Sequence, residues 1–343
     1  MNRYSYTKLS AVVAILCIPI MIFSQDIHFS NFGFAPLNIN PALTGIFPGD
    51  WRINGSFRDQ WSNVPVGYRT FGVAVDTRLG DFEKNPDRRW SAGAYINYDK
   101  AGYSDLSNLT MSLSGAYRVP LSVNQFLNAG VSLGFNQRRF NVDKLTWDDQ
   151  YRNKSYDPTF TSPDVMLFNR SSNYATANLG VDYHYQAINK RSALDIGVGV
   201  FNINQPKHGF EDAASVSLER RYSLYGGGNL QLARRFDLLG EVMAQWQGPH
   251  KELLGSIGGR FYIVDNKTKV FALQGGISLR GADAYSPHVG LIYNNWRVAV
   301  NFDGNFSQFT TATNRLGGPE VSVIYIFTKV PPGTYCPVCP TFL

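Results

Sequence analysis

The sequence predicts an all-β protein, a transmembrane antiparallel β-barrel of about 14 strands that follows a cleaved signal peptide. From residue 51 onward, segments of about ten residues alternate apolar with polar or small side chains, and turn residues separate them. Charged side chains in these segments occupy the polar register, and aromatic side chains gather near the ends of the apolar register. Aromatic bands around an aliphatic middle are typical of a barrel in a lipid bilayer.

The composition excludes several other classes of protein. Of the 343 residues, 17% are charged and 14% are aromatic, without low-complexity tracts, which argues against disordered, collagen-like and coiled-coil chains. Beyond residue 24, no stretch approaches the roughly 18 uninterrupted apolar residues of a membrane-spanning helix, so a membrane role requires strands. The net charge of +6 becomes +6 − 2 = +4 once Arg3 and Lys8 leave with the leader. These scattered charges do not form the basic patch of a nucleic-acid binder, so no nucleic-acid partner is expected.

Residues 1–24 have the organisation of a secretory signal peptide. Arg3 and Lys8 supply its charged start, Leu9 to Phe23 its apolar stretch, and Ser24 a small residue before Gln25. The short apolar stretch is interrupted by a proline, which argues against a membrane anchor.

Residues 25–50 differ from the rest of the chain, because they are rich in aromatic residues and proline but show no alternation. We expect this segment to form an N-terminal strap below the barrel mouth or a plug inside its lumen.

Residues 51–329 supply the predicted barrel. One example of the alternation is the segment in which Leu127, Ala129 and Val131 alternate with Asn128, Gly130 and Ser132. Fourteen segments of this kind are predicted, and they begin near residues 51, 70, 90, 106, 124, 173, 191, 220, 236, 250, 268, 284, 295 and 318. A soluble sandwich or propeller also alternates, but its polar face would carry abundant lysine, whereas here that face is rich in glycine, serine, asparagine and single charges. An unpaired backbone group in hydrocarbon costs several kcal/mol, so the sheet must close on itself.

The lengths of the connections predict the orientation of the barrel. With a periplasmic amino terminus, the longest connections (139–172, 203–219 and 304–317) all fall on the external side. An even number of strands then places both termini in the periplasm of a bacterial outer-membrane protein. The connection 80–89 is long for a periplasmic turn. Residues 330–343 begin with a Pro-Pro-Gly sequence after Val330, which cannot extend a central strand, so they are expected to form a periplasmic tail.

Cys336 and Cys339 form a CxxC motif in that tail. A redox dithiol would need a helix amino terminus in a βαβ setting, and one CxxC supplies only two of the four ligands of a zinc site. A local disulfide is the favoured interpretation, with a clamp on the tail as the alternative.

No arrangement of residues indicates catalysis, a cofactor or a metal. None of the five histidines lies in an HExxH motif or beside a GxSxG elbow. His184 and His288 are expected to point into the lumen, where a hydrolase could use one as a base, but a hydrogen bond to a neighbouring acid is favoured. The longest external loop contains four acids, Asp148, Asp149, Asp157 and Asp164. Their spacing is not that of an EF-hand, so a solvated polar loop is favoured over a calcium site. Gly226 to Gly228 lack the Lys-Ser/Thr of a phosphate loop and indicate close packing within a strand.

Several motifs resemble the PorP/SprF family of the Bacteroidota type IX secretion system. They are Asp26–Ser30, Pro36–Ala42 with Gly45, Arg52, and Phe57–Trp61, in that order and spacing. Further similarity lies in Asn97–Asp99, Asn301–Asp303 and the last predicted strand, Glu320–Phe327. The chain departs from the family pattern at Phe57, where tyrosine is common, and at Gly318–Glu320, where a His-Glu pair is expected.

The resemblance implies a non-enzymatic outer-membrane barrel that assists secretion or anchors a cargo. It implies periplasmic secretion and gliding components as partners and, for one branch, a large surface adhesin with a type IX C-terminal domain. The matching family residues, expected to have structural or partner-binding roles, are Asn40, Pro41, Ala42, Gly45, Arg58, Gln60 and Trp61. Pro41 and Gly45 would fix turns, and Arg58 would pair with a lumenal carboxylate. The alternatives are a diffusion channel for small solutes and an outer-membrane hydrolase.

Overall fold

A computed structural model of the chain describes most of the predicted barrel and the segment that precedes it. The described residues are 29–61, 67–79, 90–152, 154–157, 159–160, 162–163, 171–210, 216–266, 269–281, 283–306 and 313–328. The expected signal peptide, the 80–89 connection, Asp164, the tail 330–343 and its two cysteines lie outside them.

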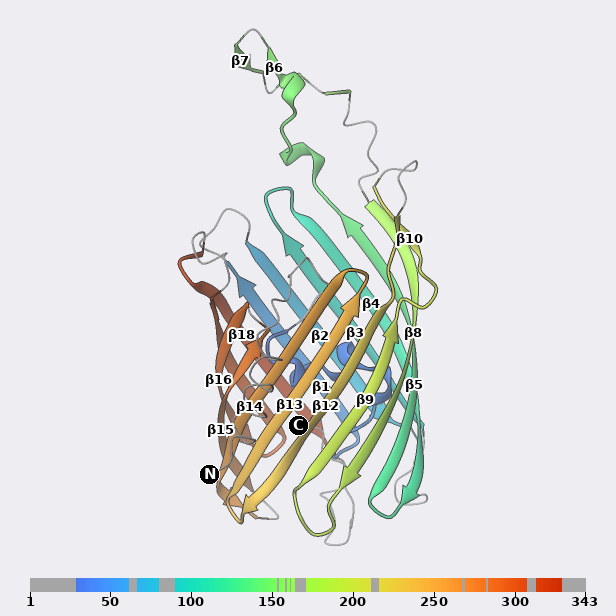
Figure 1. Ribbon diagram of the computed structural model, residues 1–343, viewed down its shortest axis with the longest axis vertical. Coiled ribbons are helices and arrows are strands. Elements are labelled where there is room, and N and C mark those ends of the chain that lie inside the picture. Colours follow the sequence, from blue (N-terminus) through green and yellow to red (C-terminus); the bar gives the residue numbers. More distant parts are fainter. Residues whose placement is uncertain are drawn as a thin grey trace, which may run out of the picture.

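Fourteen antiparallel strands in the described part of the chain form one closed, tilted barrel, which confirms the predicted fold class (Figure 1). The strands are β1 (Trp51–Gln60), β2 (Tyr68–Arg78), β3 (Trp90–Ala101), β4 (Leu106–Ser122), β5 (Gln125–Arg139), β8 (Ser171–Gln186), β9 (Ala193–Phe201), β12 (Arg221–Ala233), β13 (Phe236–Gln247), β14 (His250–Asp265), β15 (Val270–Arg280), β16 (Ala284–Tyr293), β17 (Trp296–Asn305) and β18 (Leu316–Phe327). Each start lies within two residues of the position predicted from alternation.

The ring closes between its first and last strands. β18 pairs with β1 in a register that runs from Trp51 opposite Phe327 to Arg58 opposite Glu320. A closed ring leaves no strand edge with unpaired backbone groups, which is what hydrocarbon requires.

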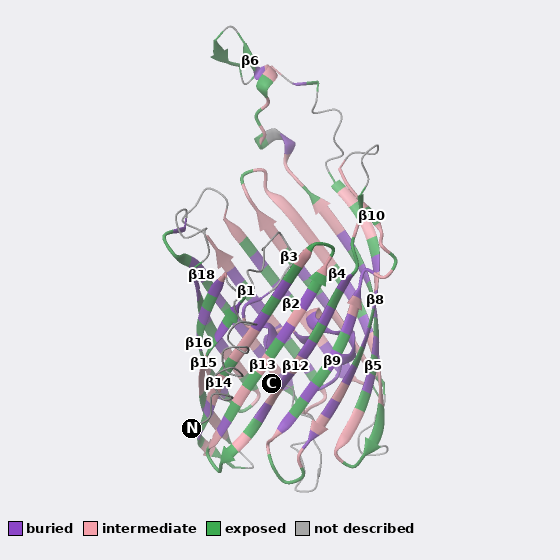
Figure 2. Cartoon of the chain, in the orientation of Figure 1, coloured by how far each residue is buried: buried purple, intermediate pink, exposed green. Residues whose placement is uncertain are grey.

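Burial alternates along the strands as the side-chain pattern requires (Figure 2). On β5, Asn128, Ser132 and Asn136 are buried inside the ring, whereas Val131 and Leu133 between them are 54% and 70% exposed on the outer surface. Such a large apolar outer surface is stable only against lipid.

The two ends of the barrel differ. One end carries the short hairpin turns between β4 and β5, β12 and β13, and β16 and β17. Because Trp51 pairs with Phe327 there, the first strand begins and the last strand ends on this side. The other end, here called the long-loop end, carries the connection between β5 and β8, with η3 (Val142–Lys144), η4 (Asp148–Gln150), β6 (Tyr151–Arg152) and β7 (Ser155–Tyr156). The small strands β10 (Lys207–His208) and β11 (Val216–Ser217) lie at this end too, and the β6–β7 hairpin extends well beyond the rim (Figure 1).

Residues 29–50, here called the lumenal segment, lie inside the ring. They form η1 (Phe32–Phe34), α2 (Pro36–Ile39) and η2 (Pro41–Leu43), which Figure 1 shows within the cylinder. Their apolar side chains pack on inward-facing apolar residues in two parts of the wall, β12–β14 and β17–β18. One cluster joins Phe32, Ile39, Leu43 and Ile46 to Tyr225, Met243 and Leu254, and another joins Phe34 and Phe47 to Ala299, Ile324 and Ile326. No helix in the described residues is long and apolar enough to cross a membrane.

Candidate functional site

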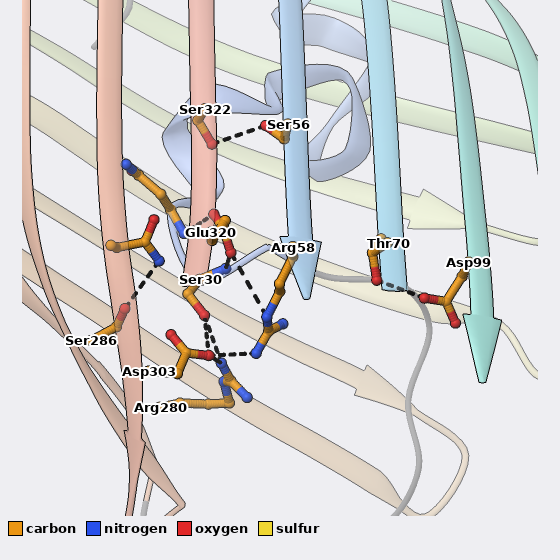
Figure 3. A network of polar contacts seen from close by, with 12 residues as sticks. Ser30, Ser56, Arg58, Thr70, Asp99, Arg280, Ser286, Asp303, Glu320 and Ser322 are labelled. Atoms are coloured by element: carbon orange, nitrogen blue, oxygen red, sulfur yellow. Dashed lines mark hydrogen bonds and ion pairs between the residues drawn. The ribbon is translucent and has the colours of Figure 1, made fainter. Parts of the chain in front are cut away.

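The first group of contacts between the lumenal segment and the wall is a buried network of charges near the long-loop end (Figure 3). Arg58 of β1 and Arg280 of β15 both donate to Oδ2 of Asp303 on β17, at 2.5 and 3.0 Å. Ser30 Oγ donates to the same oxygen at 2.9 Å, and the backbone N–H of Ser30 donates to Glu320 at 2.8 Å. Buried charges are stable only when they are paired. Arg280 also donates to Ser30 Oγ at 2.7 Å, so the network fixes the start of the lumenal segment directly to β15, β17 and β18.

A second group fixes the end of the lumenal segment. Arg52 of β1 binds Asp76 of β2 through Nε and Nη2 at 2.9 and 2.7 Å, and it also donates to the carbonyl oxygens of Leu43 and Ile46, each at 3.2 Å. The Gly45 N–H donates to Asp76 at 2.7 Å. Gly45 has a φ of +78°, in the left-handed region that favours glycine. The arginine thus neutralises the acid and also satisfies backbone carbonyls that would otherwise be buried without partners.

A third group seats the middle of the lumenal segment on a row of glycines. Gly130, Gly180 and Gly199 lie side by side on β5, β8 and β9, because Gly180 pairs with both of the others. A Cβ atom on Gly130 would overlap the backbone of Pro41 and Ala42, and one on Gly180 would overlap the Asn40 side chain. These three residues, here called the glycine row, let the segment's backbone approach the wall directly.

Asn40 locks this contact with both ends of its amide. Its Nδ2 donates to the carbonyl oxygens of Val181 on β8 at 3.0 Å and Val198 on β9 at 3.3 Å. Its Oδ1 accepts from the Ala42 N–H at 2.9 Å and so caps η2. An amide is required here, because the side chain must donate and accept at once.

Replacing Asn40 with Asp is expected to destabilise the barrel by about 1–3 kcal/mol, because the buried carboxylate would face two carbonyl oxygens without a donor. The free energy of unfolding by urea in lipid vesicles measures this loss. Asn124→Asp is the matched control, since Asn124 lies in the exposed β4–β5 turn. Equal effects of the two changes would contradict the role assigned to Asn40.

Five of the seven predicted family residues belong to the contacts between the lumenal segment and the wall, and two do not. Asn40, Pro41 and Ala42 lie on the glycine row, Gly45 lies at Asp76, and Arg58 lies in the charged network. Gln60 and Trp61 instead lie at the end of β1, where the Trp61 N–H donates to the Gly317 carbonyl oxygen at 2.6 Å and its ring packs edge-on against Tyr68. The structure therefore separates these two from the lumenal segment.

Sequence reasoning did not assign site roles to the partners of these residues. Asp76, Arg280, Asp303, Glu320 and the glycine row complete the site. One feature of the sequence could have identified the charged partners: each is a single charged residue in the polar register of a strand. A charge that faces a narrow lumen needs a partner of opposite charge.

The histidines, loop acids and glycines that the sequence analysis considered for catalysis, metal binding or phosphate binding do not come together in one site. His184 on β8 lies 2.6 Å from Asp195 on β9, whereas His288 lies on β16, with five strands between β8 and β16 in the ring order. In the long outer loop, hydrogen bonds from Thr159 lower the pKa of Asp157. The residues that the structure describes contain no group of three or more His, Cys, Asp or Glu side chains arranged to hold a metal ion. Gly227 lies within β12, beside the Tyr225 hydroxyl.

Comparison with solved structures returns membrane barrels of similar size. The Ralstonia pickettii toluene transporter TbuX matches with a TM-score of 0.50 at 11% identity, over 87% of this chain and 94% of that chain. The monoaromatic hydrocarbon channel CymD matches at 0.47 with 9% identity, over 87% and 94% of the two chains. A Pseudomonas aeruginosa FadL homologue matches at 0.45 with 10% identity, over 81% and 90%. At these identities the likeness concerns the fold alone.

The family comparison is more specific. No curated protein matches the chain. The family model described as type IX secretion system membrane protein PorP/SprF matches residues 22–325, which includes the lumenal segment and nearly the whole barrel. The resemblance predicted from the motifs is confirmed, and the fold is that of an outer-membrane β-barrel. The chain belongs to the PorP/SprF family of type IX secretion system membrane proteins.

Proposed function

We propose that this protein is a non-enzymatic outer-membrane scaffold that anchors or assists the secretion of a partner, a large surface adhesin with a type IX C-terminal domain. The observation that carries the proposal is the lumenal segment, which buried ion pairs and the glycine row hold against the wall. A barrel with an occupied lumen is suited to a rigid anchor rather than to a wide solute pore. Membership of a family of type IX secretion system membrane proteins also supports the proposal.

The proposed external contact surface is the β6–β7 hairpin. Tyr151 and Tyr156 pair across it and are 64% and 47% exposed, and Arg152 lies over the Phe160 ring. Tyrosine and arginine are enriched among the residues that dominate protein interfaces.

The proposed periplasmic surface lies at the opposite end of the barrel. There we place the carboxyl terminus and the tail 330–343, with a disulfide between Cys336 and Cys339. The amino terminus is not placed there, because Ser30, five residues after Gln25, is held in the charged network near the long-loop end. Contacts with periplasmic secretion and gliding components would form on this side.

The base of the long outer loop is expected to loosen only in strong acid. Lys144 of η3 and Lys100 of β3 donate to Asp105 in the β3–β4 turn, at 2.7 and 2.9 Å, and these hydrogen bonds lower the pKa of Asp105 below 3.8. A lowered pKa means that the contact is fully present above pH 3.8 and is lost as the pH falls through the lower value. A spin label at Leu145 is expected to become mobile only in that range, whereas in Asp105→Asn it is mobile at neutral pH. An immobile label in the variant would contradict the contact.

Co-purification tests the proposed function. The tagged full-length protein is expected to capture the C-terminal domain of an adhesin and periplasmic type IX components from cell envelopes. Replacing residues 148–157 with a Gly-Ser linker is expected to abolish adhesin capture and to preserve periplasmic partners. Deletion of the gene without effect on secretion or gliding would refute the proposal.

The second candidate is a diffusion channel for small solutes, because a polar cavity opens on the long-loop side of the lumenal segment. Conductance in planar bilayers distinguishes the two functions. The scaffold is expected to give no steady single-channel steps, whereas regular steps without capture of secretion partners would favour the channel.

A further inference from the structure

A small polar cavity lies on the long-loop side of the lumenal segment. Its volume is about 40 Å³, and its wall comes from six consecutive strands of the ring, β3, β4, β5, β8, β9 and β12. Phe201 is the last residue of β9 and Arg221 the first of β12, which places the cavity in the long-loop half of the barrel. Asn38 of α2 supplies the contribution of the lumenal segment.

The lining combines amides with a single charge. Five of the ten lining residues are asparagines: Asn38, Asn97, Asn136, Asn178 and Asn202. Thr110 and Thr176 add hydroxyl groups, Tyr95 and Phe201 add rings, and Arg221 is the one charged member of the set. None of the ten is acidic, and Arg221 also interacts electrostatically with the buried carboxyl group of Glu252 on β14.

Hydrogen bonds hold the amides in place before any ligand arrives. Thr110 donates to Asn136 Oδ1 at 2.8 Å, and Asn136 Nδ2 donates to Thr176 at 3.1 Å. Asn97 Nδ2 donates to Asn38 Oδ1 at 3.0 Å. Side chains fixed in this way bind a polar group with little further loss of conformational entropy.

Arg221 is also held in a defined orientation. Its Nη2 donates to the Asn38 carbonyl oxygen at 3.3 Å, and its guanidinium lies 4.1 Å from the centre of the Phe201 ring. A guanidinium has five N–H donors in a planar fork that matches a carboxylate. A second arginine, Arg138, lies on the same face of β5, two residues beyond Asn136 toward the long-loop end.

The cavity has room for a small polar group, because a volume of roughly 10–15 Å³ is enough for one water molecule. A planar carboxylate suits the lining, because the Arg221 fork and the amide N–H groups of the wall are donors. The geometry points to this cavity as a binding site for the carboxylate group of a polar ligand that enters from the long-loop end, with Arg221 as its charged contact. This inference goes beyond the proposed function, because it assigns a ligand to the lumen itself.

Titration calorimetry on the full chain in lipid nanodiscs tests this inference. The probes are N-acetylglycylglycine, its C-terminal amide, and galacturonate, which represent a peptide carboxylate, its neutral counterpart and a sugar acid. We expect saturable binding of at least one carboxylate and none of the amide. Arg221→Gln is expected to weaken the binding at least tenfold. Arg220→Gln is the matched control, since it removes the same charge one residue away at an exposed position and leaves affinity unchanged.

A second variant guards against misfolding. Asn136→Asp keeps an acceptor for the Thr110 hydroxyl but places a negative charge in the cavity, so it is expected to weaken carboxylate binding while the variant remains folded by tryptophan fluorescence. Binding of the peptide alone identifies a chain terminus as the source, and binding of galacturonate alone identifies a saccharide. Absence of saturable binding, equal binding of the amide, or wild-type affinity in Arg221→Gln would overturn the inference. No secretion partner is present, so such a failure leaves the co-purification result untouched.

Discussion

Replacing Asp303 with Asn is expected to lower the free energy of unfolding of the barrel by about 3 kcal/mol, because the change leaves two buried arginines without their shared counter-charge. Arg58 and Arg280 both donate to one oxygen of Asp303, and the side chains of Arg58 and Asp303 are only 3% and 1% exposed. Solvent therefore screens this interaction very little. Glu320 lies 3.9 Å from Arg58 and compensates only part of the loss.

Urea unfolding in lipid vesicles, followed by tryptophan fluorescence, measures this effect. The matched control is Asp59→Asn, because Asp59 pairs at 3.7 Å with Arg69, whose side chain is 70% exposed. Exposed pairs contribute at most about 1 kcal/mol, so this control is expected to change stability little. Combining Asp303→Asn with Arg58→Ala provides a double-mutant cycle. Strictly additive losses would show that Arg58 and Asp303 do not interact, and would contradict the network.

Replacing Gly180 with Val is expected to displace the lumenal segment from the wall and to cost about 1–3 kcal/mol through overpacking. The Cβ atom would overlap the Asn40 side chain, which is itself hydrogen-bonded to β8 and β9 and has no room to retreat. Two effects should appear together: a lower stability, and exposure of a segment that is buried in the native barrel.

Accessibility of a cysteine reports the displacement directly. Thr44→Cys, in a background in which Cys336 and Cys339 are serine, places a thiol at a position that is 2% exposed. Maleimide labelling is expected to be slow in this background and fast after Gly180→Val. Gly55→Val is the control, because a Cβ atom on Gly55 meets no heavy atom within 4 Å. Labelling at the background rate in Gly180→Val would show that the glycine row does not hold the segment.

The alternation in the sequence was sufficient to locate the strands, because side-chain direction along a strand is a local property with a period of two residues. It placed the start of β5 and of β17 within one residue of the observed positions. The alternation did not reveal that Tyr225, Met243 and Ile324 face inward, because apolar residues are expected to face lipid. In the structure these residues pack against the lumenal segment. Their role depends on a segment that is distant in the sequence.

The sequence by itself determined a membrane barrel, its strand number, and the positions at which an inward charge or a glycine needs an explanation. Only the tertiary structure decided which acid pairs with which arginine, because Arg58 and Asp303 are 245 residues apart and meet through closure of the ring. The same holds for Gly130, Gly180 and Gly199, which become one row only when three strands align. Pairing across the lumen is set by strand register and ring size, and neither is encoded in the local pattern of any one strand.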